Sequence, residues 1–230
     1  MYFDPLYLLF ILPPLALSLW ASFSTKSTFN RYSRVRSASG LTGGEAARQM
    51  LARAGVHDVE IVRTSGFLSD HYNPVTKKLA LSEAVYSQPT VAAIGVGCHE
   101  AGHAIQHAQK YAPLWLRSAL VPTANIGSSI GYFVMFGGLL LSSAKMVLFG
   151  AILFSAVLLF QIITLPVEFD ASARAKRLAF QYGLVTDQER RGMSKVLNAA
   201  ALTYVAAAVS TLMTLLYFLL RAGLMGGNRD

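Results

Sequence analysis

Residues 146–165, MVLFGAILFSAVLLFQIITL, form a run of 20 residues without a charged side chain. A helix needs about 20 mostly apolar residues to cross the hydrocarbon core of a bilayer, so this run predicts a transmembrane helix. Three more runs qualify, at residues 5–24, 116–141 and 196–220. The composition agrees, with 53% hydrophobic residues, 14% charged residues and a mean hydropathy of +0.44. We therefore expect a single membrane domain over residues 1–230, mainly α-helical, with four transmembrane helices.

The basic residues predict the orientation of these helices. Lysine and arginine are enriched in short cytoplasmic segments next to membrane spans. They follow the first apolar run and crowd the connection 166–195, whereas few lie at the opposite ends of the runs. Residues 25–115 and 166–195 should therefore be cytoplasmic, with both termini outside the cell. The net charge of +8 then reflects topology, and because no basic stripe is interleaved with aromatic residues, a nucleic-acid partner is not expected.

Two helices are expected in the extramembrane region 25–115. Thr42 and Glu45 form a capping-box pattern, so a short helix should begin there and stop at Gly55. Ser87 and Pro89 should open a longer helix. This second helix would lead almost directly into the second apolar run, and its residues would therefore lie close to the membrane surface.

A metal-binding pattern occurs in this second helix, at residues 97–107, GCHEAGHAIQH. Residues four apart share one helical face, so His99 and His103 can bind the same ion. Glu100 stands where zinc metalloproteases place the general base that activates water. Cys98 is the only cysteine, so no intramolecular disulfide can form, and a small buried apolar role is expected for it. The pattern predicts a zinc site, and a helix with surface histidines is the alternative.

A catalytic zinc usually has three protein ligands, so one more side chain is needed. Glu168 follows the third apolar run by about one helical turn, where a carboxylate without a partner would be costly. A metal would supply that partner, and an ion pair with a nearby Lys or Arg is the alternative. Asp170 is the competing ligand, but Arg174 lies four residues further on and is a ready helical ion-pair partner.

Two stretches together resemble a known family. They are DHYNPVTKKLALSEAVYSQPTVAAIGVGCHEAGHAIQHA at residues 70–108 and LPVEFDASARAKR at residues 165–177. They resemble the YugP-like neutral zinc metallopeptidases of bacterial membranes, which are in turn similar to the HtpX-type and CAAX-prenyl-protease-type membrane gluzincins. The resemblance implies one zinc ion (Zn²⁺) per chain, in a small α+β gluzincin-like region at the cytoplasmic membrane surface. By this resemblance the metal ligands are His99, His103 and Glu168, and the catalytic residue is Glu100.

One position departs from the pattern of the more distant relatives. They have an aspartate four residues after the glutamate, and this chain has Ser172 there. Carboxylate support for a zinc-bound histidine would then come from Asp170 or be absent. His107, one more turn along the motif helix, is rotated too far to reach the same ion, so we expect it at the surface or bonded to neighbouring groups.

Two short strands are expected at residues 59–63 and 78–82, separated by the turn-rich stretch 64–76. The second strand is a candidate edge strand for binding a substrate backbone, and an ordinary core strand is the alternative. It consists of Lys78, Leu79, Ala80, Leu81 and Ser82. In the intervening stretch, one of three polar residues could stabilise the oxyanion of a tetrahedral intermediate, and a simple turn is the alternative. These residues are His71, Tyr72 and Asn73.

The sequence therefore predicts a membrane-embedded zinc endopeptidase. It would hydrolyse membrane or membrane-proximal polypeptides at the cytoplasmic face, so its expected partners are a polypeptide substrate and the lipid bilayer. A zinc-binding membrane scaffold or regulator without proteolytic activity is the alternative. A transporter is disfavoured because the polar cluster falls at the ends of the apolar runs and not within them.

Overall fold

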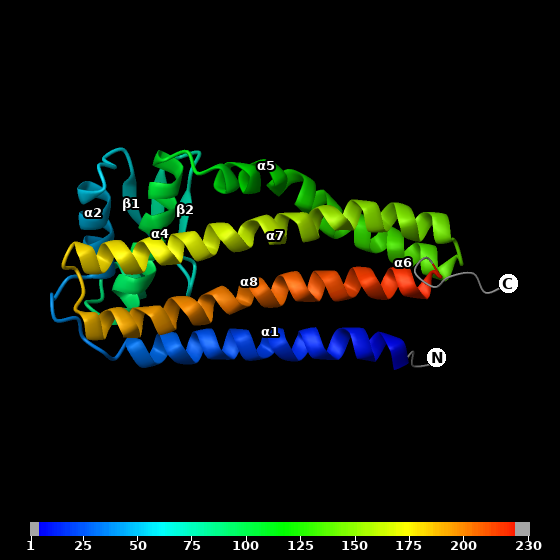
Figure 1. The fold of residues 1–230 in the computed structure, drawn as a ribbon, viewed down its shortest axis with the longest axis horizontal. Coiled ribbons are helices and arrows are strands. Elements are labelled where there is room, and N and C mark those ends of the chain that lie inside the picture. The colour runs from blue at the N-terminus through cyan, green and yellow to red at the C-terminus, as the bar shows by residue number, and fades with distance from the viewer. Residues whose placement is uncertain (1–4, 224–230) are drawn as a thin grey trace. The chain divides into compact units, whose positions relative to one another are not determined.

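The computed structural model describes residues 5–223, and most of these residues are helical (Figure 1). Within this range four segments are long and apolar enough to cross a membrane. They are α1 (Pro5–Tyr32), α5 (Ala112–Ile126) with its continuation, α7 (Ala144–Gln181) and α8 (Asp187–Arg221). The prediction of a mainly helical chain with four candidate transmembrane helices is confirmed. The two chain ends, which the sequence predicts outside the cell, are beyond the described residues.

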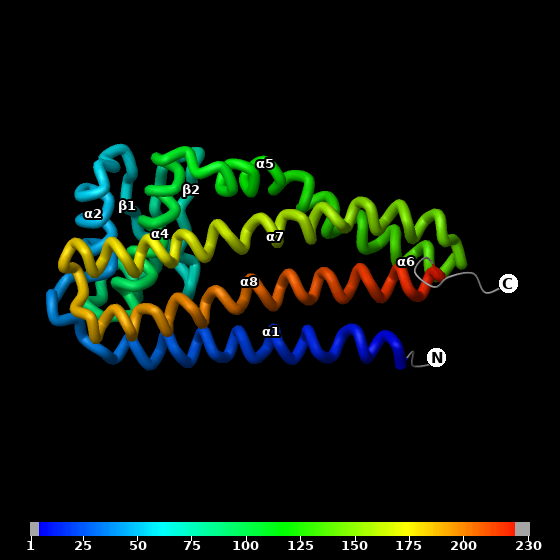
Figure 2. The backbone as a smooth tube through the Cα atoms, viewed as in Figure 1, coloured from blue at the N-terminus to red at the C-terminus, as the bar shows by residue number. Residues whose placement is uncertain are grey.

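α7 and α8 extend well beyond the apolar runs that predicted them. α7 has 38 residues and continues through Pro166, and α8 has 35 residues and begins at Asp187, before its apolar run. A helix satisfies its own backbone hydrogen bonds, so it does not have to end where the apolar side chains end. Most of the connection 166–195 is consequently helical, and the chain leaves helical structure only briefly between α7 and α8 (Figure 2).

The second candidate span is not one regular α-helix. α5 passes into a π-helical turn, η1 (Gly127–Gly131), and then into α6 (Tyr132–Leu140). A Cβ atom on Gly131 would lie 2.7 Å from the backbone nitrogen of Phe154, and one on Gly150 would lie 2.6 Å from that of Met135. Small residues let membrane helices approach this closely, and glycine is therefore needed on both sides of this contact.

The chain divides into two compact units. The first, which we call the spanning unit, comprises residues 5–21, 116–165 and 203–223 of the described chain. The second, the motif unit, comprises residues 22–115 and 166–202. α1, α7 and α8 each contribute residues to both.

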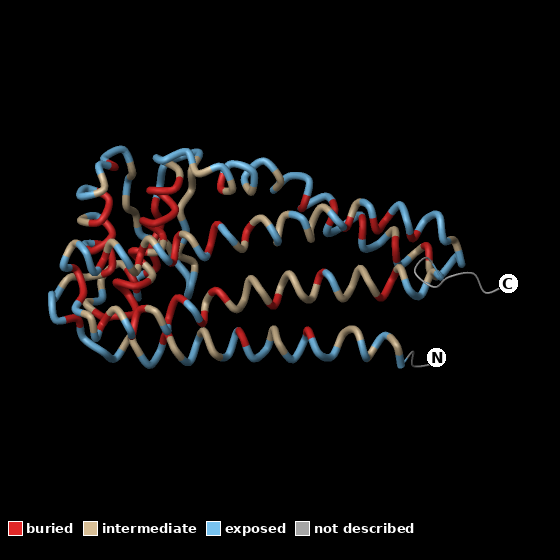
Figure 3. Tube along the Cα trace, viewed as in Figure 1, coloured by how far each residue is buried: buried red, intermediate tan, exposed pale blue. Residues whose placement is uncertain are grey.

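The spanning unit exposes apolar side chains that would be unfavourable in water. Only 11–28% of the residues in the four apolar windows are buried within the protein, and Figure 3 shows these helices mostly in the colours of intermediate and exposed residues. Trp20, Phe133 and Phe149 are among the exposed side chains. Lipid tails would cover them, as expected for a membrane-spanning unit.

The motif unit contains a three-stranded sheet and three short or medium helices. Its elements are α2 (Gly43–Arg53), β1 (Glu60–Thr64), β2 (His71–Asn73), β3 (Lys78–Ser82), α3 (Glu83–Tyr86) and α4 (Val91–Ala108). The predicted capping box is confirmed, because the Thr42 side chain accepts from the Glu45 backbone and the Glu45 carboxylate accepts from the Thr42 backbone. α4 begins after Thr90, whose side chain caps it, and not at residues 87–89 as predicted.

The sheet corrects one sequence prediction. The strand order is β1-β3-β2, with β1 parallel and β2 antiparallel to β3. β3 is therefore the central strand, and the prediction that Lys78–Ser82 is an edge strand was wrong. The sequence missed β2 because its three residues lie among turn-forming residues, and their pairing with β3 comes from a contact that no local pattern records. β3 is instead a core strand, with Leu79 and Leu81 fully buried.

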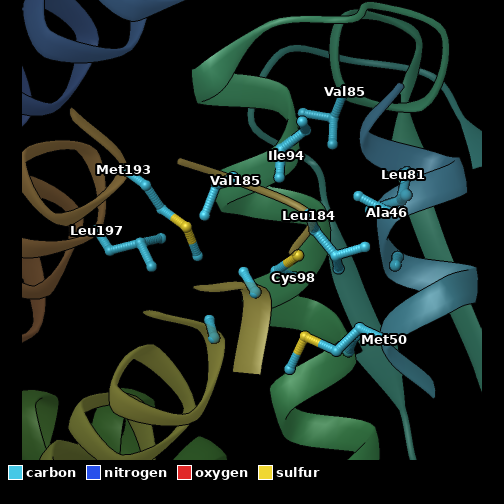
Figure 4. Close-up of a cluster of buried hydrophobic side chains, with 14 of the residues drawn as sticks. Ala46, Met50, Leu81, Val85, Ile94, Cys98, Leu184, Val185, Met193 and Leu197 are labelled. Carbon is cyan, nitrogen blue, oxygen red and sulfur yellow. The ribbon is translucent and has the colours of Figure 1, made fainter. Parts of the chain in front are cut away.

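The core of the motif unit fills the space around α2, α4 and β3 (Figure 4). Met50, Leu81, Ile94 and Met193 are fully buried there. Cys98 is also fully buried, as predicted, and burial raises the pKa of its thiol to about 12. The core thus fixes α4, the helix that carries the histidine pair, against its neighbours on several sides.

Candidate metal centre

A close approach of α4 to α7 builds the site. A Cβ atom on Gly102 would lie 2.7 Å from the carbonyl oxygen of Ala171, so the backbones of the two helices touch at this glycine. Gly102 precedes His103 in the motif, and Ala171 lies one helical turn after Glu168. The contact therefore places Glu168 beside the histidine-bearing face of α4.

Three potential metal ligands converge at this contact. Nε2 of His99 lies 3.2 Å from Oε2 of Glu168, and Nε2 of His103 lies 3.5 Å from the same oxygen. One ligand atom from each residue lies within 4.8 Å of the others. Glu168 and His103 are buried, and the His99 side chain is 14% exposed. The sequence prediction that these residues meet is therefore matched by the geometry.

The spacing suits a zinc ion. Ligands about 2.0–2.1 Å from a tetrahedral zinc ion lie about 3.3–3.4 Å from one another, so the distances of 3.2 and 3.5 Å lie close to this value. Two imidazole nitrogens and one carboxylate oxygen are also the donor set of catalytic zinc sites that keep a position open for water. The residues present therefore fit a zinc ion in donor type and in the distances from Glu168 to the two histidine nitrogens.

The hydrogen bonds of Gln106 determine which nitrogen of His103 is protonated. Gln106 is fully buried, and its amide nitrogen donates to the backbone oxygen of Val167 and to Oδ2 of Asp170, both at 2.8 Å. Since these two groups can only accept, the amide oxygen must face Nδ1 of His103, at 2.9 Å. Nδ1 therefore carries the proton, and the lone pair on Nε2 is available to a cation.

Ser172 makes the corresponding contact with His99. Its hydroxyl lies 3.1 Å from Nδ1 of His99 and is 4% exposed as a residue. A hydroxyl oxygen can accept a hydrogen bond from Nδ1–H, which leaves Nε2 of His99 available to a cation. Ser172 thus contacts the histidine directly, whereas Asp170 reaches the other histidine through Gln106.

The electrostatic surroundings of His103 favour its binding to a cation. Burial lowers the pKa of its imidazole, but the hydrogen bond and negative charge of Glu168, together with the charge of Glu100, outweigh this effect and raise the pKa. These carboxylates make the pocket attractive to positive charge. Glu100 is 8% exposed, and within residues 5–223 its carboxylate has no hydrogen bond or ion pair. It is therefore free to accept a proton.

The remaining candidates lie on β2 and at the end of α4. The hydroxyl of Tyr72 lies 2.8 Å from Nδ1 of His107, and burial raises the pKa of Tyr72 to about 12, with the charge of Asp58 as a smaller cause. His71 is exposed and bonds the backbone oxygen of Ser69. Of the three candidates on β2, Tyr72 is the one that is hydrogen-bonded to α4.

Asn73 behaves as a turn residue. Its side-chain oxygen accepts from the backbone nitrogens of Val75 and Thr76, at 2.9 and 3.2 Å. These bonds occupy the amide oxygen in local structure. These bonds support the alternative interpretation of the sequence, a simple turn at Asn73-Pro74.

Sequence reasoning missed the roles of Gln106 and Ser172. Gln106 lies three residues after His103 on α4, and Ser172 lies four residues after Glu168 on α7. Both spacings place a side chain on the same helical face as a candidate ligand, and this was the available signal. Glutamine and serine carry no charge, however, and a search for carboxylate partners passes over them.

The fold and the site together define a class of protein. The chain matches the family described as "Putative neutral zinc metallopeptidase" over residues 7–223 and belongs to that family. It is a multi-pass membrane protein of this family. It is 45% identical over 215 residues to the "Putative membrane protease YugP" of Bacillus subtilis (strain 168), covering 94% of this chain and 96% of that protein. No solved structure matches the chain.

Proposed function

We propose that this protein is a membrane-embedded, gluzincin-type zinc endopeptidase that hydrolyses membrane or membrane-proximal polypeptides at the cytoplasmic face. One observation carries the proposal. Two imidazole nitrogens and the Glu168 carboxylate converge within 4.8 Å in a chain of a zinc metallopeptidase family, and the buried Glu100 carboxylate beside them has no hydrogen bond or ion pair within residues 5–223.

Each residue of the site has a role in this proposal. His99, His103 and Glu168 would hold one zinc ion, which when bound polarises the scissile carbonyl and lowers the pKa of water towards about 7. Glu100 takes the proton from the attacking water and delivers it to the leaving amine. No side chain or backbone group of the described chain bonds to its carboxylate, so both oxygens are available for that transfer.

Gln106 and Ser172 are proposed to orient the two histidines. Gln106 fixes the His103 ring with Nδ1 protonated, and the Ser172 hydroxyl accepts from Nδ1 of His99 when Nε2 binds the metal. Tyr72 is a candidate donor to the oxyanion, and its bond to His107 holds it beside α4. With β3 in the centre of the sheet, β2 is the edge strand tied to α4 and is the better candidate for pairing with an extended substrate.

The cytoplasmic placement rests on the basic residues of the motif unit. They follow the first apolar run and lie on the last turns of α7 and the first turns of α8. Residues 25–115 and 166–195 would then form one cytoplasmic catalytic region of a single membrane domain. A substrate cut there would have to lie at or near the inner surface of the membrane.

A peptide-library cleavage assay with the purified protein tests this function. The parent and the Glu100→Gln variant are compared, with zinc content measured on both by elemental analysis. Loss of the general base should lower cleavage by about 10²–10⁴-fold while zinc remains bound. If the zinc-loaded parent cleaves no more than the variant does, the protein is a zinc-binding scaffold or regulator and not a peptidase.

A further inference from the structure

A groove rich in basic side chains lies between the last turns of α7 and the first turns of α8, apart from the metal centre. Its volume is about 790 Å³. Five of its lining residues are basic and none is acidic. These five are Lys176, Arg177, Arg190, Arg191 and Lys195. The helical spacing aligns them, because residues three or four apart lie on one face of each helix.

The positive charge in this groove is only partly neutralised. Asp187 pairs with Arg190 at 2.8 Å and also with Arg191, so one carboxylate serves two guanidinium groups. Lys176 donates to the neutral side-chain oxygen of Asn198, at 3.2 Å. Arg177 and Lys195 are exposed and form no ion pair within the described chain. The groove therefore has an excess of positive charge that favours an anionic ligand.

The groove also has an apolar surface. Phe180 lines it with 43% of its surface exposed, and the guanidinium of Arg190 lies 4.6 Å from the centroid of the Phe180 ring. The methylene stems of the lysines and arginines add apolar area. A free inorganic anion would make no use of such a surface. An anion with a phosphate next to a carbon-rich group, such as the headgroup of a phospholipid, would contact both parts.

The position of the groove along the chain indicates the source of that anion. Lys195, a lining residue, directly precedes the apolar run 196–220 of α8, a helix long and apolar enough to cross the membrane. Phospholipid phosphates lie at the ends of transmembrane runs, and basic clusters there attract anionic lipids. Topology alone requires basic residues on one side of the membrane, but it does not require that they converge around an aromatic ring.

We propose that this basic groove binds the phosphodiester headgroup of an anionic phospholipid. The site is independent of the peptidase chemistry, and its failure would leave the proposed enzyme activity untouched. Arg177 and Lys195 provide charges that have no ion-pair partner within residues 5–223, and Lys176 adds its charge beside them. Phe180, which lies further from the apolar run along α7, packs against the carbon atoms of the headgroup.

Native mass spectrometry of the purified protein in mixed phosphatidylglycerol and phosphatidylcholine micelles tests this proposal. The parent should retain phosphatidylglycerol in preference to phosphatidylcholine by about tenfold or more. The triple variant Lys176→Gln, Arg177→Gln, Lys195→Gln should lose that preference. A control variant removes three exposed basic residues of the same unit that lie outside the groove, Lys26→Gln, Arg34→Gln and Arg36→Gln, and should keep it.

Three results would overturn the proposal. The parent could bind both lipids equally, the control could lose the preference as fully as the groove variant, or millimolar inorganic phosphate could displace the phosphatidylglycerol. The second result would indicate general charge attraction, and the third a site for a free anion. If the triple variant does not fold, the single variant Arg177→Gln, at an exposed position, tests the proposal. It should lose part of the preference for phosphatidylglycerol.

Discussion

The side-chain amide of Gln106 donates a hydrogen bond to the carboxylate of Asp170 across 2.8 Å, although 64 positions separate the two residues. Arg174 pairs with the same carboxylate, so Asp170 is held without any metal. Gln106 in turn faces Nδ1 of His103. In many metalloenzymes a carboxylate supports a metal-binding histidine directly. Here the Gln106 amide lies between the carboxylate and the histidine. It fixes the orientation of the His103 ring, and the negative charge of Asp170 lies one residue further from that ring.

The two carboxylates of α7 should differ in their effect on zinc binding. Glu168→Ala removes a proposed ligand and should abolish zinc retention during dialysis against a mild chelator. Asp170→Ala removes only the group behind Gln106, and it should weaken zinc binding by no more than about 10–100-fold. Asp170→Asn, which can still accept from Gln106, is the matched control and should resemble the parent. If the two alanine variants exchanged behaviour, Asp170 would be the third ligand.

Gln106 should be needed for the orientation of His103 and not for the fold of the motif unit. Gln106→Leu keeps the volume of the side chain but leaves Nδ1 of His103 without an acceptor, and should weaken zinc binding by about 10–100-fold. Gln106→Glu restores an acceptor for Nδ1, but its second carboxylate oxygen would face the oxygens of Val167 and Asp170, so only part of the affinity should return. Chelator competition measures both, with the unfolding temperature of the metal-free protein as a control. Equal zinc affinity in the parent and the leucine variant would refute the orienting role.

Ser172 should support His99 in the same manner. Ser172→Ala removes the partner of Nδ1 and should lower zinc affinity by about tenfold. Ser172→Asp places at this position the residue of the more distant relatives, and it should bind zinc at least as tightly as the parent. Competition with a chromogenic chelator gives both affinities. An alanine variant indistinguishable from the parent would show that His99 is held by packing alone.

The predicted topology can be tested with two isosteric cysteine variants. Ser65→Cys lies at an exposed position of the motif unit and should be protected from an impermeant maleimide in intact cells, because that unit should be cytoplasmic. Ser142→Cys, exposed between α6 and α7, should react without permeabilisation. Native Cys98 can remain, since burial raises its pKa to about 12 and hides the thiol. Labelling of Ser65→Cys in intact cells would place the motif unit outside.

The sequence by itself determined the features that depend on neighbouring residues. The run 146–165 predicted a membrane helix because hydrocarbon thickness sets its length, and α7 contains it. The pattern at Thr42 and Glu45 predicted the start of α2, since a capping box closes within one helical turn. His99 and His103 share a helical face for the same local reason, and the zinc motif could therefore be read directly.

Only the tertiary structure decided which distant groups meet. Glu168 reaches the histidines because Gly102 lets α4 touch α7, a contact between backbones that no sequence period encodes. The sheet order, which makes β3 central, arises from pairing between strands separated along the chain. The role of Gln106 depends on acceptors that its buried amide meets only in the folded chain, the Val167 carbonyl and the Asp170 carboxylate. Local periodicity follows from backbone geometry, whereas these contacts follow from packing, which depends on the whole chain at once.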